Sequence, residues 1–304
     1  MTAITFSSAE RALGKTRLRV SPMAWGMWRF RGDDLAVAQG RMEAALAAGF
    51  TLLDTADVYG LDNGEPFGAA EALLGRVLKA APTLRGRFVL AGKAGIWPGT
   101  PYDSSEAYLT AAVEASLKRM NVERIDLFQI HRPDVLTHPA DLARTLERLQ
   151  SAGKIGEVGV SNFTAAQTAA LAAHLPFPLA STQVEYSPAA IGPLTDGVLD
   201  QALEAGLGVL AWSPLAGGRL GTGGETTART AAVAHALDQL AERHEVSRPV
   251  MAYAWIMAHP ARPIPIVGTQ EPKRIAEAAQ ALGVRLTHQE WYGVLVAARG
   301  EPLP

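Results

Sequence analysis

Short apolar runs alternate with longer segments in which apolar residues recur at helical spacing along most of the chain. The runs are rich in β-branched residues and are nearly continuous in their apolar character, which is typical of buried strands in a parallel sheet. We expect strands at 51–54, 88–93, 125–131, 155–160, 180–184, 207–212 and 263–267, and the segment VSPMAW at 20–25 supplies an eighth.

Capping signals mark the ends of the helices expected between these strands. One helix runs from about Asp34 to Ala48, with Gly49 as the residue after its end. Another begins at DSSE, where Asp103 caps the helix and Glu106, three residues on, completes a capping box. Further helices are expected at 139–152, 165–174, 271–282 and 288–299.

Eight strand–helix units predict an α/β fold, a (β/α)₈ TIM barrel that forms a single domain over residues 1–304. A doubly wound sheet is the competing fold, but it usually carries G-x-G-x-x-G when it binds a dinucleotide, and the sequence lacks that motif. The stretch RALGKTRLRV predicts an N-terminal β-hairpin that turns at Gly14 and Lys15, and residues 285–304 add an extra C-terminal helix. We interpret residues 217–230 as a mobile loop after the seventh strand.

Composition narrows the classes of partner. The 304 residues are 48% hydrophobic and 19% charged with a net charge of −2, and no basic stripe is present, so we expect no nucleic-acid partner. No segment has the length and apolar character of a membrane span or a signal peptide. The absence of cysteine excludes disulfides and thiol nucleophiles and fits the expected cytoplasmic location. We expect a monomer or a weak oligomer.

Charged residues stand at the ends of three consecutive predicted strands: Asp54 in LLDT, Lys93 in VLAGK and His131 in LFQIH. Tyr59 follows the first of them by five residues. Each residue alone has an ordinary explanation, as a turn cap, a solvent-facing lysine, a loop histidine or a surface tyrosine. In a barrel, however, the active site lies at the C-terminal ends of the strands, where these four side chains would meet.

Together the four groups form a proton donor. A free tyrosine has a pKa of about 10, and a nearby ammonium group favours the phenolate and lowers that value. Asp54 would hold Lys93, and His131 could donate a hydrogen bond to an oxygen facing Tyr59. This set suits a carbonyl group that gains negative charge, and the hydride must come from a cofactor. A Schiff-base aldolase with Lys93 as nucleophile is the alternative, although the adjacent Asp54 disfavours it.

No metal is expected, because the seven histidines show no H-E-x-x-H or similar ligand spacing.

Several motifs in order resemble the aldo-keto reductase superfamily. DTADVYG, the lysine of LAGKAG, HRPD at 131–134 and GVSNF at 159–163 match its signatures in spacing, and TQVEYSP, AWSPLAGG and VGTQEPKRIAEA extend the resemblance to about residue 280. HRPD and Trp212 are similar to a bacterial oxidoreductase subgroup. The resemblance implies reduction of an aldehyde or ketone by NADPH, with Asp54, Tyr59, Lys93 and His131 as the catalytic residues. A non-catalytic, nucleotide-sensing subunit, like the potassium-channel β-subunits of this fold, is a less favoured alternative, because no partner-binding extension is apparent in the sequence.

The resemblance also implies a cofactor site. Ser161, Asn162 and Gln183 would hold the nicotinamide carboxamide, and Trp212 would stack on its ring, although core packing and a helix cap are the ordinary explanations for Trp212 and for the Ser–Asn pair. Ser213, Leu215 and Gly217 would lie along the pyrophosphate, and Gly268, Thr269, Gln270, Arg274 and Glu277 would surround the adenosine phosphate and adenine. The remaining expected cofactor contacts are Gly26, Met27, Trp28 and Asp54.

Two positions depart from the family pattern. Many relatives have a lysine where Gly268 stands and an asparagine where Ala278 stands, so phosphate affinity would depend on Arg274, with Lys273 as a second cation. This weakens the preference for NADP over NAD without reversing it. A small-molecule carbonyl is the expected substrate, and we expect its pocket to be lined by Trp28, Tyr59, Trp97 and His131, with Tyr102 as a further aromatic wall.

Overall fold

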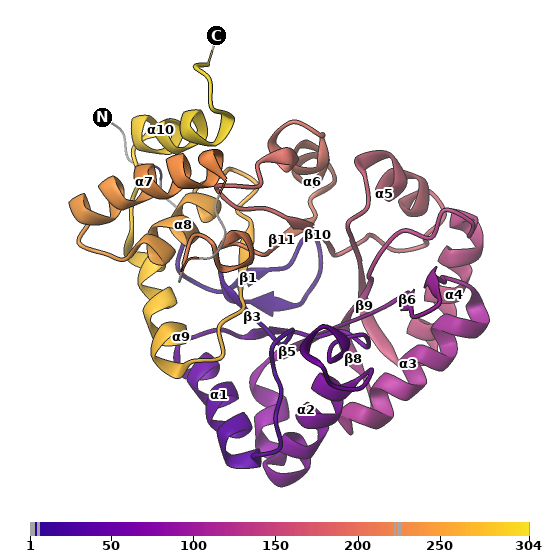
Figure 1. Ribbon diagram of the computed structural model, residues 1–304. Coiled ribbons are helices and arrows are strands. Elements are labelled where there is room, and N and C mark those ends of the chain that lie inside the picture. Colours follow the sequence, from indigo (N-terminus) through magenta and orange to yellow (C-terminus); the bar gives the residue numbers. More distant parts are fainter. Residues whose placement is uncertain (1–3, 5–6, 222, 224–226, 304) are drawn as a thin grey trace.

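A computed structural model describes residues 4, 7–221, 223 and 227–303 of the chain. Eight parallel strands form a closed barrel in the order β3-β4-β5-β8-β9-β10-β11-β12, and helices surround it (Figure 1). The barrel strands are β3 (Ala24–Gly26), β4 (Leu52–Asp54), β5 (Val89–Ala94), β8 (Ile125–Ile130), β9 (Ile155–Ser161), β10 (Ser181–Glu185), β11 (Gly208–Trp212) and β12 (Ile264–Val267). The predicted TIM barrel and its eight strands are therefore confirmed.

Helices follow the strands and pack their apolar faces on the barrel. They are α1 (Leu35–Ala47), α2 (Ala69–Ala80), α3 (Glu106–Met120), α4 (Pro139–Ser151), α5 (Ala165–Ala172), α6 (Val198–Ala205), α7 (Ala228–Arg243), α8 (Arg248–Met257), α9 (Pro272–Ala278) and α10 (His288–Arg299). Short 3₁₀ helices are η1 (Leu61–Asn63), η2 (Pro82–Arg87), η3 (Gly192–Leu194), η4 (Ala216–Gly218) and η5 (Ala279–Gly283).

The ends of the helices test the predicted capping signals. The helix expected from about Asp34 to Ala48 is α1, and Asp34 is its N-cap, accepting a hydrogen bond from the Val37 amide. The prediction that Asp103 caps the next helix is wrong, because Ser105 is the N-cap of α3 and accepts from the Tyr108 amide. Asp103 instead accepts from the amide of Ser105 at 2.8 Å and so shapes the turn before the helix.

The N-terminal hairpin pairs β1 (Arg11–Ala12) with β2 (Arg19–Val20) and lies outside the barrel. Leu13 of its turn is buried in the core inside the barrel, so the hairpin closes the end of the barrel opposite the C-terminal ends of the strands. Gly14 has φ +59°, and a Cβ there would lie 2.4 Å from the carbonyl oxygen of Ala180. Only glycine fits this conformation and this close approach, which explains the turn predicted at this position.

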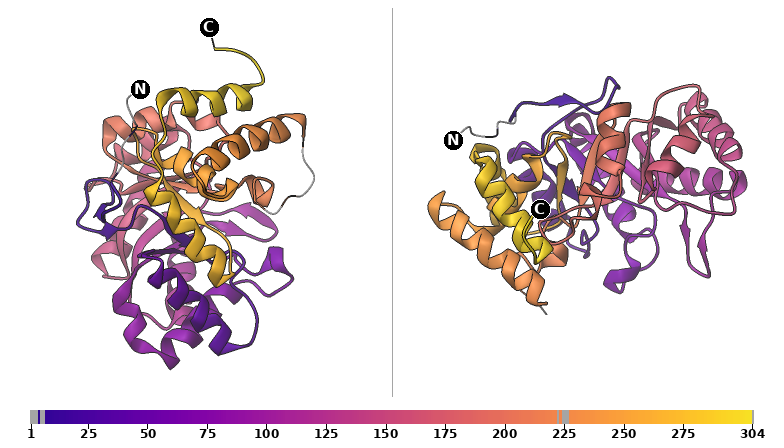
Figure 2. Two further views of the ribbon diagram at one scale, coloured as in Figure 1. Left: turned by 90° about the vertical axis from the view of Figure 1, so that its left-hand side faces the viewer. Right: turned by 90° about the horizontal axis from the view of Figure 1, so that it is seen from above.

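The C-terminal helix α10 packs beside α7 and α8 at the edge of the barrel, as Figures 1 and 2 show. Trp255 of α8 and Trp291 of α10 stack with ring centroids 4.8 Å apart and planes within 5°. Each indole N–H donates to the other residue's carbonyl at 3.0 Å. This reciprocal pair fixes the extra helix to the barrel.

The segment predicted as a mobile loop, 217–230, is only partly described, since residues 222 and 224–226 lie outside the described residues. Its first residues belong to η4 and its last belong to α7, which begins at Ala228. After β5 the chain forms a small antiparallel ribbon of β6 (Ile96–Trp97) and β7 (Thr100–Tyr102), which the sequence pattern did not predict.

Candidate active site

The ends of β4 and β5 bring Asp54 and Lys93 together. Lys93 Nζ donates to Asp54 Oδ2 at 2.5 Å and to the carbonyl oxygen of Thr55 at 2.9 Å. Both charged side chains are almost fully shielded from solvent, with exposed fractions of 0% and 3%. A buried pair of this kind costs desolvation energy that its geometry must offset, so it is better explained by a role in the site than by stability.

Two glutamines complete the surroundings of the carboxylate. The side-chain amides of Gln183 and Gln129 donate to Asp54 Oδ1 at 2.9 and 3.3 Å, and Gln183 also donates to the Oε1 of Gln129. Gln129 was not among the predicted site residues. Its signal was present, because a polar residue two positions before His131 in an apolar strand shares the face of the strand on which side chains point inward.

The ammonium of Lys93 stays charged in this environment. Burial lowers its pKa, but the attraction of the Asp54 carboxylate and the contact with Tyr59 outweigh burial and hold the pKa above its ordinary value. A nucleophilic amine must be free of its proton, so the structure disfavours Schiff-base chemistry at Lys93. The charge is instead available to act on its neighbours.

Tyr59 lies in the loop after β4, over the ion pair. Lys93 Nζ is 5.0 Å from the centroid of its ring, and the His131 ring meets it edge-on at 5.9 Å. Burial raises the pKa of Tyr59, and Asp54 adds to this effect, while Lys93 opposes it and favours the phenolate. The phenol is therefore protonated at neutral pH, with a cation placed to stabilise the phenolate that forms when the proton leaves.

His131 follows β8 directly and is 9% exposed. Burial, together with the positive charges of Lys93 and Arg132, lowers its pKa well below the ordinary value, so the ring is neutral at pH 7. Its Nδ1 is buried without a partner among the described residues. An unpaired lone pair is tolerated better than an unpaired N–H, which favours the tautomer with the proton on Nε2.

Asp57, the second acid of DTADVYG, lies behind this site and is fully buried. The hydroxyl of Tyr108 reaches its Oδ2 at 3.4 Å, and its Oδ1 has no partner among the described residues. Burial, with the nearby Glu71 carboxylate, raises the pKa of Asp57 well above its ordinary value. The two acids of the motif thus differ, since Asp54 forms an ion pair with Lys93 whereas Asp57 is buried beside Tyr108, in surroundings that favour its protonated form more than water does.

Asn162 joins the ends of three strands beside the cluster of Asp54, Tyr59, Lys93 and His131. Its side-chain amide donates to the carbonyl oxygen of His131 at 3.2 Å and to Ser161 Oγ at 2.9 Å, while its Oδ1 accepts from Trp212 Nε1 at 3.0 Å. The residue has φ +59°, a conformation that asparagine adopts more readily than most side chains. Asn162 therefore fixes the plane of Trp212 relative to His131.

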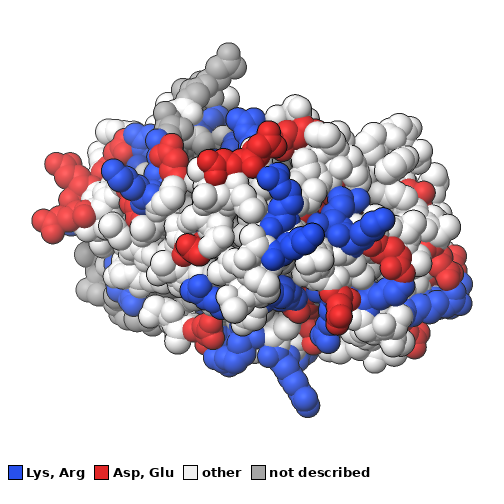
Figure 3. All heavy atoms as spheres, turned by 90° about the horizontal axis from the view of Figure 1, so that it is seen from below, with Lys and Arg blue, Asp and Glu red and all other residues white. Residues whose placement is uncertain are grey.

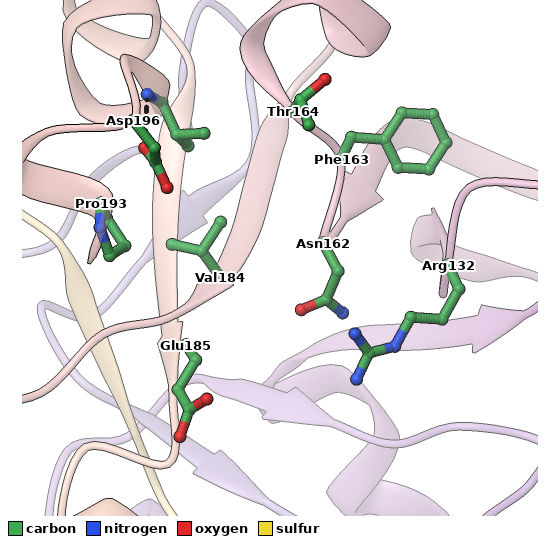
Figure 4. Close-up of a pocket in the computed structure, with 9 residues that line it drawn as sticks. Arg132, Asn162, Phe163, Thr164, Val184, Glu185, Pro193 and Asp196 are labelled. Carbon is green, nitrogen blue, oxygen red and sulfur yellow. Dashed lines mark hydrogen bonds between the residues drawn. The ribbon is translucent and has the colours of Figure 1, made fainter. Parts of the chain in front are cut away.

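Two cavities flank this cluster, and Arg132 lines both. One, of about 330 Å³, is drawn in Figure 4, where the side chains of Arg132, Asn162 and Glu185 point toward the same open space. The other, of about 670 Å³, lies between the loop after β4 and the β6–β7 ribbon, and its lining includes Trp97 and Tyr102. Trp28 lies outside the lining of both cavities, and its indole N–H donates to Asp62 Oδ2 at 3.1 Å.

The segments expected to hold the rest of a cofactor follow β11 and β12. In the segment after β11, Ser213 and Gly217 have positive φ, and Leu215 precedes η4. The Gly217 amide is already paired, because it donates to Ser213 Oγ at 2.7 Å. In the second, Gln270 donates to the carbonyl oxygen of Gly26 at 3.0 Å and its Oε1 is buried without a partner among the described residues.

The predicted phosphate contact Arg274 lies on α9. Its Nε is 3.0 Å from Glu271 Oε2, and both side chains are about half exposed. Glu277 lies one turn further along the same helix, and Met27 is buried at the end of β3 with its amide bonded to the carbonyl oxygen of Asp54.

The described part of the chain contains neither a helix suited to span a membrane nor a cluster of side chains suited to bind a metal ion. Its helices lack the combination of length and apolar character needed to cross a bilayer. Across the same residues, no group of three or more His, Cys, Asp and Glu side chains is placed to hold a metal ion. Positive and negative side chains alternate over the face shown in Figure 3.

Comparisons with known proteins identify the family and the fold. The model of the aldo/keto reductase family matches residues 22–294. The chain is 53% identical to a 6-dehydroglucose reductase of Novosphingobium aromaticivorans over the full length of both proteins. It is 36% identical to a 6-dehydroglucose reductase of Agrobacterium fabrum, over 96% of this chain and 99% of that one. The crystal structure of the thermostable aldo-keto reductase Tm1743 shares the fold, with a TM-score of 0.81 and 22% identity over 95% of this chain and 99% of that one.

Proposed function

The chain belongs to the aldo/keto reductase family, and from this membership we propose that it reduces the aldehyde of 6-dehydroglucose, or of a closely related sugar, with NADPH. The protein is thus an oxidoreductase. The observation that carries it is the charged Lys93, buried against Asp54 and beside the ring of Tyr59. This arrangement supplies a proton to an oxygen at the mouth of the barrel.

We assign the proton to Tyr59. When a carbonyl oxygen gains charge, the phenol transfers its proton, and the phenolate left behind is stabilised by Lys93. The neutral His131 donates from Nε2 to the same oxygen, which orients the carbonyl and lowers the cost of the developing charge. Asp54, held by two glutamine amides, keeps the ammonium in place.

The residues near the mouth fit a dinucleotide. Gln183 uses its amide N–H for Asp54, and the buried Oε1 of Gln270 has no partner among the described residues. This Oε1 is an acceptor suited to an amide or hydroxyl group of a nucleotide. We propose that Ser161, Asn162, Gln183 and Trp212 hold the nicotinamide end and that the segments after β11 and β12 hold the phosphates. When bound, the cofactor supplies the hydride that no side chain can supply.

A sugar aldehyde agrees with the mixed lining of the two cavities. Arg132 and Glu185 offer hydrogen bonds to hydroxyl groups, and Trp97 offers an apolar face. The similarity to the two 6-dehydroglucose reductases, one of them over the full chain, supports this substrate. We further propose one domain over 1–304, a cytoplasmic location, and a monomer or weak oligomer.

A test compares carbonyl substrates with both cofactors. Purified protein is assayed for consumption of NADPH and NADH with 6-dehydroglucose, glyceraldehyde 3-phosphate and an aromatic aldehyde. We expect the highest kcat/KM for 6-dehydroglucose with NADPH. A preference for the aromatic aldehyde by tenfold or more would contradict the sugar assignment. Tight NADPH binding without turnover of any of them would favour the nucleotide-sensing alternative.

A further inference from the structure

The end of β3 and the segment after β12 are joined across the first and last strands of the barrel. Trp25 Nε1 donates to the carbonyl oxygen of Thr269 at 2.9 Å, and Gln270 Nε2 donates to that of Gly26 at 3.0 Å. These bonds connect residues 244 positions apart in the sequence. The two segments therefore present their outer groups as one surface.

Arg29 extends over this surface. Its Nη1 is 3.7 Å from the position that a Cβ on Gly268 would occupy, and, apart from the adjoining residues 267 and 269, no other described side chain comes within 4 Å of that position. Its guanidinium lies over the ring of Trp28, 4.5 Å from the centroid. Stacking restricts the guanidinium while leaving its N–H groups at the edge free to bind a ligand.

The charge of Arg29 is available. Among the described residues it has neither a hydrogen bond nor a carboxylate partner, and its side chain is exposed. Arg274, by contrast, already pairs with Glu271 at 3.0 Å, so a phosphate must compete with that carboxylate. Arg29, in the segment after β3, is therefore the cation best placed beside Gly268, which has no side chain of its own.

We propose that Arg29 binds a phosphate group of the dinucleotide, in the place that a side chain at position 268 would otherwise fill. The inference rests on the function proposed above, because it specifies how the same cofactor is held. Loops after the last two strands of such barrels commonly bind phosphate, and the planar guanidinium of arginine matches phosphate oxygens in pairs. Both the 2′-phosphate and the pyrophosphate have this chemistry.

Cofactor titrations test the inference without turnover. Dissociation constants for NADPH and NADH are measured by calorimetry for the unmodified protein, Arg29→Met and Arg29→Lys. Arg17→Met serves as the matched control, because it removes the same charge from the exposed turn of the hairpin at the far end of the barrel. We expect Arg29→Met to weaken NADPH binding by at least about tenfold, the loss of one bond to a charged group, while Arg29→Lys loses less and the control is unchanged.

NADH separates the two phosphates. A loss confined to NADPH assigns Arg29 to the 2′-phosphate, and an equal loss for both cofactors assigns it to the pyrophosphate. Arg29→Met binding both cofactors within twofold of the unmodified protein would overturn the inference, and so would equal losses in the Met and Lys variants. If the unmodified protein bound neither cofactor, the proposed function itself would fail, which distinguishes the two failures.

A rescue variant excludes a purely structural effect. Gly268 has an ordinary backbone conformation, and the space beside it is open apart from Arg29. Arg29→Met combined with Gly268→Lys should therefore recover most of the lost affinity, since the new lysine returns a cation to the same place. No recovery, in a variant that unfolds at the same temperature as the unmodified protein, would count against the inference.

Discussion

Removing one charge from the buried pair of Asp54 and Lys93 should destabilise the protein more than removing both. In Asp54→Asn, the ammonium of Lys93 stays buried without a counter-charge and keeps its hydrogen bond to the carbonyl oxygen of Thr55. In Lys93→Met, the carboxylate stays buried with two glutamine amides as donors. Breaking a buried pair costs about 3–5 kcal/mol. Because the remaining hydrogen bonds stabilise the unpaired charge, we expect each single variant to lose about 3 kcal/mol in free energy of unfolding.

The double variant buries no charge. Replacement of a buried pair by uncharged groups is often close to neutral, so we expect a loss of about 1–2 kcal/mol for Asp54→Asn with Lys93→Met. Since the single losses sum to about 6 kcal/mol, the coupling between the two charges is about 4 kcal/mol. The exposed pair of Arg299 and Glu301, 2.8 Å apart, gives the comparison, with an expected coupling below about 1 kcal/mol.

Urea unfolding at pH 7, followed by circular dichroism, measures all variants of both cycles. Equal slopes of free energy against urea concentration would show that the variants expose the same surface. The reasoning is refuted if the loss in the Asp54 and Lys93 double variant equals the sum of the single losses within about 0.5 kcal/mol. It would also fail if the exposed pair coupled as strongly as the buried one.

Three further outcomes follow from the site. Tyr59→Phe should lower kcat by about 10²–10⁴ and leave NADPH affinity within twofold, because only the proton donor is lost; a variant that keeps a tenth of the rate would exclude Tyr59 as the acid. Lys93→Met should move the basic limb of the kcat/KM profile to higher pH, since the ammonium opposes the rise in the pKa of Tyr59; an unmoved limb would separate the two groups. The pKa of His131 is lower in the folded protein than its unfolded value of about 6.5, so the unfolded chain takes up the proton more readily. The free energy of unfolding should therefore fall as pH drops below about 6.5. In urea titrations at several pH values, His131→Asn should lose this part of the pH dependence.

The sequence predicted the barrel and the meeting of charged side chains at its mouth because both depend on local signals. Eight short apolar runs identify strands, and parallel strands of a barrel end at one face, so Asp54, Lys93 and His131 had to lie close together. The turn at Gly14 was likewise predictable, since it needs a left-handed conformation in a short polar stretch.

Features that depend on pairing between distant segments were not predictable in this way. The contact of Gln129 with Asp54 needs the register in which Lys93 lies beside Gln129 on neighbouring strands. The cap at Ser105 is a local feature, and it was missed for another reason: Asp103 carries an equally good capping signal two residues earlier. The approach of Arg29 to Gly268 depends on closure of the barrel between its first and last strands.

The stacked pair of Trp255 and Trp291 gives the protein a built-in optical reporter. Two indoles held nearly parallel at 4.8 Å couple their electronic transitions, and this coupling contributes a circular dichroism band that separated indoles lack. Because one ring belongs to α8 and the other to α10, the band should vanish when the C-terminal helix detaches. Detachment of α10 can then be followed while the barrel itself is still folded, and Trp291→Phe identifies the band.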